Sequence, residues 1–152
     1  MDLTKIVSIS GYPEVFKVIK EARKGVIVES LLTGKRMQAF LTQKISSLED
    51  IAIFTSEGDI KLKEVFRRIY EKENGNKAPE PKNISKQEIV KYFEQVLPEY
   101  DKDRVYISDM KKVLRWYNLL LEKDLLDFSQ EDKQDKEQNQ ENKTQEDKEQ
   151  ET

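Results

Sequence analysis

The chain has 152 residues, of which 36% are hydrophobic and 38% charged, and its formal net charge is −3. It contains no cysteine and no histidine, which excludes disulfides, thiolate nucleophiles, cysteine-ligated metals and the commonest general base. The N-terminus lacks a signal-peptide core and no stretch approaches ~18 uninterrupted apolar residues, so we expect a cytoplasmic protein without membrane contacts.

The negative charge is concentrated at the C-terminal end. Residues 129–152 contain nine acidic and four basic side chains, and no aliphatic or aromatic residue. Such a segment cannot bury enough apolar surface to offset an ordering cost of ~1–2 kcal/mol per residue, so we predict a disordered charged tail. Residues 1–128 hold 23 basic and 21 acidic side chains, and this near-neutral balance does not mark them as a nucleic-acid or membrane binder.

The first third of the chain has the apolar spacing of β-strands. Between residues 5 and 55 the period is closer to two than to 3.6, and Thr33-Gly34 is a turn suited to a hairpin. The predicted strands cover residues 6–10, 15–19, 26–31, 37–41 and 51–55. Five short strands favour a small antiparallel barrel, because closure leaves little exposed edge.

The period changes to that of a helix after Gly58. Residues 60–73 place their apolar side chains on one face, with Asp59 as the expected N-cap and Asn74-Gly75 as the end of the helix. Residues 74–84 are rich in glycine, proline and asparagine, which predicts a stiffened linker.

Two further helices are predicted after the linker. Ser85 and Glu88 have the spacing of a capping box at the start of the first, and Pro98 ends it. Ser108 is the expected N-cap of the second, which runs to about Lys123.

The predicted organisation is therefore of the α+β class. It comprises a small five-stranded antiparallel barrel domain with a terminal helix over 1–73, a linker over 74–84, a helical domain over 85–128 and the disordered tail over 129–152.

Nine short stretches along residues 1–128 are specific when taken together. They are Ile9-Ser10-Gly11 with Pro13, Gly25 with Ile27–Leu31, Gly34-Lys35-Arg36, Leu48–Ile51, Val65-Phe66 with Ile69–Lys72, Tyr92-Phe93, Leu97-Pro98 with Tyr100-Asp101, Asp103–Tyr106 and Trp116-Tyr117-Asn118. In these stretches the chain resembles a bacterial family that carries a domain of unknown function. The resemblance implies an SH3-like or Sm-like N-terminal barrel, a C-terminal helical domain and a bacterial cytosolic setting. It implies no active-site residue.

The basic residues near two predicted turns are candidates for an interaction surface. Arg23 and Lys24, together with Lys35 and Arg36, could form a basic rim on the barrel that holds RNA. A lysine-rich hairpin tip is more commonly a solvated turn that discourages edge pairing. The aromatics close in sequence, Phe16, Phe40 and Phe54, lie in runs typical of a core and supply no stacking platform.

An acidic group and a single tryptophan are the other candidates. Asp101, Asp103 and Asp109, with Glu99 nearby, could bind a divalent cation. The interleaved basic residues instead favour an ion-paired turn, so no metal, cofactor or catalytic residue is assigned. Trp116 lies off the apolar stripe of its helix and is either a partner anchor or, by preference, a cover over the joint between barrel and helices.

These observations lead to a functional hypothesis with two alternatives. The first choice is a non-enzymatic binding or scaffolding module with a protein partner, and homo-oligomerisation stays open. The alternatives are an RNA-binding regulator that uses the barrel rim and a carboxylate-dependent metal-binding enzyme.

Overall fold

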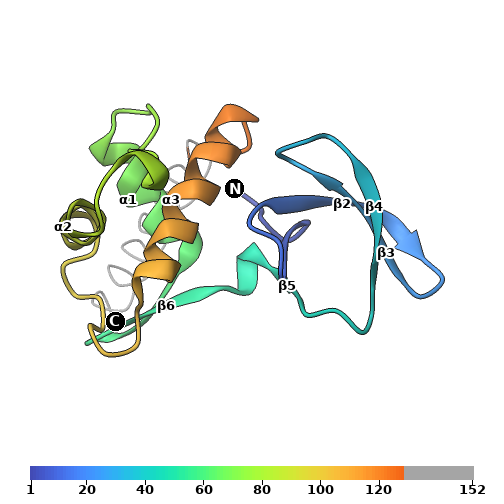
Figure 1. Ribbon diagram of the computed structural model, residues 1–152, viewed down its shortest axis with the longest axis horizontal. Helices are drawn as coiled ribbons and strands as arrows, with labels where there is room; N and C mark the ends of the chain where they lie inside the picture. Colours follow the sequence, from blue (N-terminus) through green and yellow to red (C-terminus); the bar gives the residue numbers. More distant parts are fainter. Residues whose placement is uncertain (129–152) are drawn as a thin grey trace, which may run out of the picture.

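The computed structural model describes residues 1–128, so the predicted tail over 129–152 lies outside the described residues. In Figure 1 the helices occupy one side of the molecule and the large sheet the other, with α3 nearest the sheet. The strands are β1 (Ile6–Ile9), β2 (Val15–Ala22), β3 (Gly25–Ser30), β4 (Arg36–Phe40), β5 (Ile45–Ser47), β6 (Ala52–Thr55) and β7 (Gly58–Lys61). The helices are α1 (Leu62–Lys72), α2 (Lys86–Val96) and α3 (Ile107–Glu122), with short 3₁₀ turns η1 (Leu48–Asp50) and η2 (Pro81–Asn83). The α+β class is confirmed.

The large sheet is antiparallel and has the strand order β4-β3-β2-β1-β5. Its inner face follows the period of two, because alternate residues of paired strands meet on one side. Val7 lies opposite Phe16, Val18 opposite Val28, and Val28 opposite Met37. Five buried residues form the small core of this face: Val7, Ile9, Phe16, Val28 and Ala39.

The connection between β4 and β5 requires the sheet to curl. Laid flat, five strands would separate the two outer strands by about 19 Å. The five Cα steps from Phe40 to Ile45 span at most about 18 Å when fully extended, and here the segment turns, with the Gln43 N–H donating to the Phe40 carbonyl at 2.9 Å. The sheet is therefore curled. Within residues 1–128, however, no hydrogen-bonded ladder joins β4 to β5, so the strand pairs do not include the one that would close the predicted barrel.

The fifth predicted strand forms part of a separate hairpin. Residues 52–55 pair with 58–61 across a two-residue turn rather than with the large sheet. The fifth place in the large sheet is taken by β5, a short run that the sequence pattern did not predict. The assignment of residues 51–55 to the barrel was therefore wrong.

The predicted helices are present with different starts. Helix α1 begins after Lys61, because Asp59 belongs to β7 and cannot serve as the cap. Ser85 caps α2 as predicted, its hydroxyl accepting the Glu88 N–H at 3.1 Å. Helix α3 begins after Tyr106 instead of Ser108, and the Asp109 carboxylate accepts the Tyr106 N–H at 2.9 Å.

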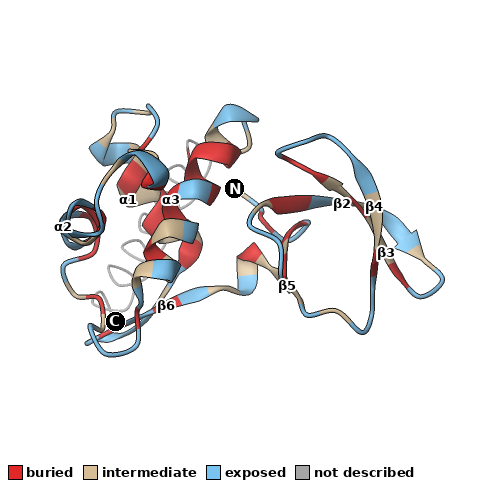
Figure 2. Cartoon of the chain, in the orientation of Figure 1, coloured by how far each residue is buried: buried red, intermediate tan, exposed pale blue. Residues whose placement is uncertain are grey.

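One large core joins the helices to part of the sheet. Leu3, Ile6, Val15, Leu31 and Leu48 belong to the same buried cluster as the apolar faces of α1, α2 and α3. Figure 2 shows the buried stretches of α1 and α3 within the helical side of the molecule. The buried apolar residues of the first 48 positions are thus divided between this core and the inner face of the sheet.

Residues 74–84 are held against the helices by hydrogen bonds from buried side chains. Asn118 is 4% exposed, and its amide oxygen accepts the Ala78 N–H at 2.8 Å while its nitrogen donates to the Ala78 carbonyl at 3.0 Å. The Tyr117 hydroxyl donates to the Asn76 carbonyl at 2.8 Å, and burial raises the pKa of Tyr117 to about 12. The predicted linker is therefore anchored to α3 at Asn76 and Ala78, while the predicted division into domains at this point stays a prediction.

Candidate functional site

The structure does not bring the candidate basic residues together. Arg23 and Lys24 form the turn before β3, whereas Lys35 and Arg36 follow the turn after it. A six-residue strand separates its two ends by roughly 17–20 Å. Arg36 also faces Glu29 across the strands, with Nε 3.9 Å from the carboxylate. The single basic rim expected from the sequence is thus two separate groups.

The three aromatics assigned to the core differ in exposure. Phe16 is 2% exposed, as expected, but Phe40 is 47% and Phe54 is 39% exposed. Phe40 lies opposite Gly25 at the edge of the sheet, and the Arg104 guanidinium lies 4.2 Å above the Phe54 ring. The expectation of a core position was wrong for these two residues.

Trp116 lies at the junction of the sheet and the helices, the position that the sequence favoured for it. It is 8% exposed, and its indole nitrogen donates to the Pro13 carbonyl at 3.2 Å. Its burial in this contact leaves little of the ring surface for a protruding anchor.

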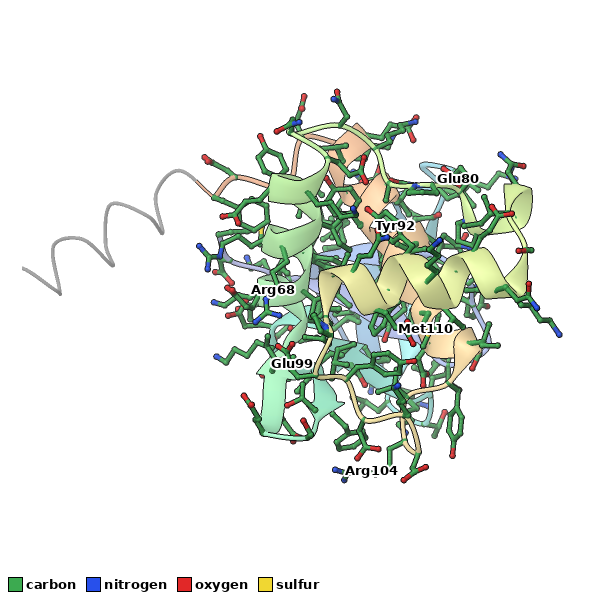
Figure 3. The ribbon with its side chains drawn as sticks, turned by 90° about the vertical axis from the view of Figure 1, so that its left-hand side faces the viewer. Arg68, Glu80, Tyr92, Glu99, Arg104 and Met110 are labelled. Atoms are coloured by element: carbon green, nitrogen blue, oxygen red, sulfur yellow. The ribbon has the colours of Figure 1, made fainter. Side chains whose placement is uncertain are left out.

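The acidic candidates are each engaged in local structure. The Asp101 carboxylate accepts the Asp103 N–H at 2.9 Å and is paired with Arg104 Nε at 2.9 Å, and the hydrogen bond from Arg104 is the main reason why the pKa of Asp101 is lowered. Glu99 is turned toward Arg68 at 2.7 Å (Figure 3), and that bond lowers the pKa of Glu99. Among residues 1–128 no acidic cluster is arranged to hold a metal ion. The geometry is that of the ion-paired turn.

A cavity of about 210 Å³ lies where β6, the start of α1 and α3 meet. We call it the seam cleft. Its apolar lining comes from Ile51, Ala52, Ile53, Phe54, Leu62, Val105, Val113 and Trp116, and its polar lining from Arg104, Asp109 and Lys112.

The polar groups of the seam cleft differ in what they already bind. Arg104 is paired with Asp101 and covers Phe54, and Asp109 holds the start of α3 through Tyr106. Lys112 is exposed, and within the part of the chain that the structure describes no acidic side chain forms an ion pair with it. The cleft therefore combines an apolar interior with an exposed cation, Lys112, that makes no ion pair among the described residues, and with the Asp109 carboxylate on the same helix.

A second cavity, of about 380 Å³, lies further along α3. It lies between the loop at Pro13-Glu14, the exposed Leu32, the η2 turn and the C-terminal half of α3. Its charged lining contains Glu14, Glu80 and Glu122 as well as Lys82 and Arg115, so its charges are mixed in sign.

Sequence reasoning missed Phe54, Arg104 and Lys112 as members of one site. The available signal was the spacing of Lys112 four residues before Trp116, which places both on one side of a helix. The other wall comes from residues about 50 positions earlier, and no local pattern connects the two.

Two family models each match one part of the chain. Residues 3–48 match a domain of unknown function (DUF5606) and residues 51–120 match a second (DUF6852). A solution NMR structure of a protein from Bacteroides vulgatus is 39% identical to this chain, covers 84% of it and 91% of its own length, and superposes with a TM-score of 0.69. The chain belongs to the same family as that protein. No curated protein matches.

The two family models divide the elements between them. The first covers the large sheet, and the second covers the β6–β7 hairpin with the three helices. The two matches meet between residues 48 and 51, and the division expected at 74–84 stays a prediction. The predicted resemblance to a family with a domain of unknown function is confirmed. Within residues 1–128, no helix has the length and apolarity that crossing a membrane requires.

Proposed function

We propose that this protein is a non-enzymatic protein-binding module and that the seam cleft is its binding site. The observation that carries the proposal is an apolar cavity at a junction of three elements, lined by an exposed cation, Lys112, that makes no ion pair among the described residues. Sites that bind small ligands commonly enclose ~300–1,000 Å³. The smaller cavity here suits one or two side chains of a protein partner.

The chemistry of the charged groups favours binding over catalysis. Asp101, Glu99 and Asp109 accept hydrogen bonds from Arg104, Arg68 and the Tyr106 N–H respectively. A general acid or base needs a group positioned against a substrate and with a pKa near the working pH. Lowered pKa values at Asp101 and Glu99 move these carboxylates away from that range.

The test is site-specific crosslinking in a bacterium that encodes the protein. A photoreactive phenylalanine analogue replaces Phe54 in the seam cleft or, as a matched exposed aromatic, Phe40 on the sheet. We expect discrete protein adducts at position 54. If neither position yields an adduct above background, the binding proposal is rejected.

A second candidate function, RNA binding, is supported by one observation on the sheet. Phe40 and Leu41 are 47% and 79% exposed, and the Leu41 N–H donates to the Lys24 carbonyl at 3.0 Å. Proteins that bind single-stranded RNA combine an exposed aromatic ring, on which a base stacks, with basic side chains that contact the backbone. Phe40 beside Arg23 and Lys24 offers this combination. In this candidate Lys35 and Arg36 take no part, because they lie at the other end of β3.

A gel shift at low salt against total RNA tests this second candidate. Lys24→Glu should abolish binding and Lys35→Glu, at the opposite end of the strand, should leave it unchanged. Absence of any shift with the unaltered protein at tens of micromolar, or equal effects of both variants, would remove RNA binding.

We further propose that the curled sheet is a small Sm-like barrel and that the protein works in the bacterial cytoplasm. The short connection between β4 and β5 supports the barrel, because it brings the two outer strands to the same side. The absence of cysteine is compatible with the cytoplasm. Slow amide exchange at the outer edges of both β4 and β5 would support closure, and cell fractionation tests the location.

A further inference from the structure

We propose that the seam cleft binds an extended peptide that adds to the open edge of β6 and carries an acidic residue close to an apolar one. This inference rests on the proposed protein-binding function and names the kind of partner. Three features of the cleft support it: a free strand edge, a cavity of side-chain size and an exposed lysine, Lys112, that makes no ion pair among the described residues.

The free strand edge follows from the alternation of an antiparallel ladder. The Leu62 N–H donates to the Ile51 carbonyl at 2.9 Å, which fixes the β6–β7 pattern. Ile53 and Thr55 then direct their backbone groups toward β7, and Ala52 and Phe54 direct theirs to the opposite edge.

The opposite edge of β6 is only partly covered. The segment at residues 99–101 pairs there, with the Asp101 N–H donating to the Phe54 carbonyl at 2.9 Å and the Ser56 N–H donating to the Glu99 carbonyl at 2.9 Å. Before Phe54 this pairing stops. Among residues 1–128 the Ala52 N–H and carbonyl and the Phe54 N–H have no hydrogen-bond partner. An extended peptide could continue the pairing along this edge, which is the recognition mode known as strand addition.

The cavity beside that edge provides a place for one apolar side chain. Val105, Val113 and Trp116 are 6%, 3% and 8% exposed and supply apolar lining. At about 210 Å³ the cavity is too small for the face of a partner helix, whose apolar contacts extend over several turns. A strand with a single inserted side chain fits both the size and the exposed backbone.

The charge at the cleft determines which residue of the peptide can lie next to its apolar side chain. Lys112 lines the cavity and is exposed, with no ion pair among the residues that the structure describes. Arg104 is already paired with Asp101, and the Asp109 carboxylate accepts the Tyr106 N–H, so Lys112 is the charged group of the lining that is left for a partner. A carboxylate within two positions of the apolar anchor would compensate Lys112, whereas a basic residue there would be repelled.

The experiment is selection of short random peptides on the full-length protein. We expect the recovered sequences to share an apolar residue with Asp or Glu within two positions. Binding of a recovered peptide is then followed through the emission of Trp116, the single tryptophan of the chain, which lines the cleft. Hydrogen exchange should show the Ala52 and Phe54 amides becoming protected when the peptide binds.

Two pairs of variants test the contacts. Lys112→Glu should weaken binding roughly tenfold or more, because a charge-assisted contact becomes repulsive. Lys111→Glu, one position away on α3, should have little effect. Ala52→Pro removes the open N–H, a change that a strand edge facing solvent tolerates, and should abolish binding, whereas Ala52→Ser keeps the N–H and should bind. Urea unfolding of each variant verifies that it is folded.

The outcomes separate this inference from the proposed function. Recovery of no peptide, with no adduct at position 54, rejects both. Recovered peptides that lack acidic residues, bind equally to Lys112→Glu, or leave the Ala52 amide unprotected would keep a binding module but overturn strand addition at this cleft.

Discussion

Trp116 and Pro13 are 103 positions apart in the sequence and are joined by a hydrogen bond of 3.2 Å from the indole N–H to the backbone carbonyl. This bond connects the third helix to the loop between the first two strands. It crosses the boundary between the two matched domains.

Replacing Trp116 with phenylalanine should separate the contribution of this bond from that of the ring. Trp116→Phe keeps an aromatic side chain but removes the donor, and we expect the free energy of unfolding to fall by about 1 kcal/mol. Trp116→Leu, which also removes the aromatic ring, should cost more. Urea denaturation followed by circular dichroism measures both, and a Trp116→Phe protein as stable as the parent would show that the bond contributes nothing net.

Asn118→Ala should destabilise the protein strongly, although the substitution removes only a small side-chain amide. The change leaves the Ala78 N–H and carbonyl buried without the partners at 2.8 and 3.0 Å, and each unsatisfied group costs ~1–3 kcal/mol. We expect a total loss of roughly 2–4 kcal/mol in chemical denaturation. Asn83→Ala, an exposed asparagine at the end of η2, is the control and should change stability by less than about 0.5 kcal/mol.

Gly25→Ala tests a close approach of two strands. A Cβ at Gly25 would lie 1.9 Å from the carbonyl oxygen of Ala39, which is backbone and cannot rotate away. We expect a loss of about 3 kcal/mol or more, because β3 and β4 must separate.

Gly34→Ala is the matched control for that clash. Gly34 has φ +75° and nothing within 4 Å of an added Cβ, so only the conformational cost of about 1–2 kcal/mol applies. If Gly34→Ala proved the more damaging in thermal or urea unfolding, the close contact at Gly25 would be ruled out as the controlling factor.

Stability should decrease on acidification through the pair of Arg68 and Glu99. The hydrogen bond from Arg68 lowers the pKa of Glu99 in the folded state, so its stabilising contribution is present above the unfolded pKa and is lost as the pH falls through the folded one. We expect the loss below about pH 5. Since the two side chains are 34% and 27% exposed, the contribution should stay below about 1 kcal/mol.

The measurement is urea unfolding across this pH range for the parent, Glu99→Gln and Arg68→Gln. Each variant should show a shallower decrease in stability on acidification than the parent. An unchanged pH dependence in both would contradict a role for the pair.

The sequence was sufficient to predict elements where the pattern is local. The period of two predicted the first four strands, and the Ser85–Glu88 spacing predicted the start of α2. Strand β5 escaped prediction because Ile45-Ser46-Ser47 has one apolar residue, too few for a period. The strand at 52–55 was assigned to the wrong sheet because residues 59–61 were predicted to be the start of a helix, so its hairpin partner β7 was not predicted.

The candidate site was harder to predict from the sequence, because the fold decides which distant residues come together. Lys24 and Lys35 are close along the chain, yet the strand between them places them at opposite ends. Lys112 and Phe54 are far apart in sequence and meet only after α3 docks beside β6. The open edge at Ala52 becomes apparent only once the pairing of β6 on both sides is known.

The core shared by Leu3, Ile6, Val15 and Leu48 with the three helices makes the two matched domains mutually dependent. A cut after residue 50 would leave apolar side chains of each fragment in contact with water, so neither would be soluble and native by itself. When the two fragments are mixed, they should instead associate and fold together, as the halves of a split reporter protein do.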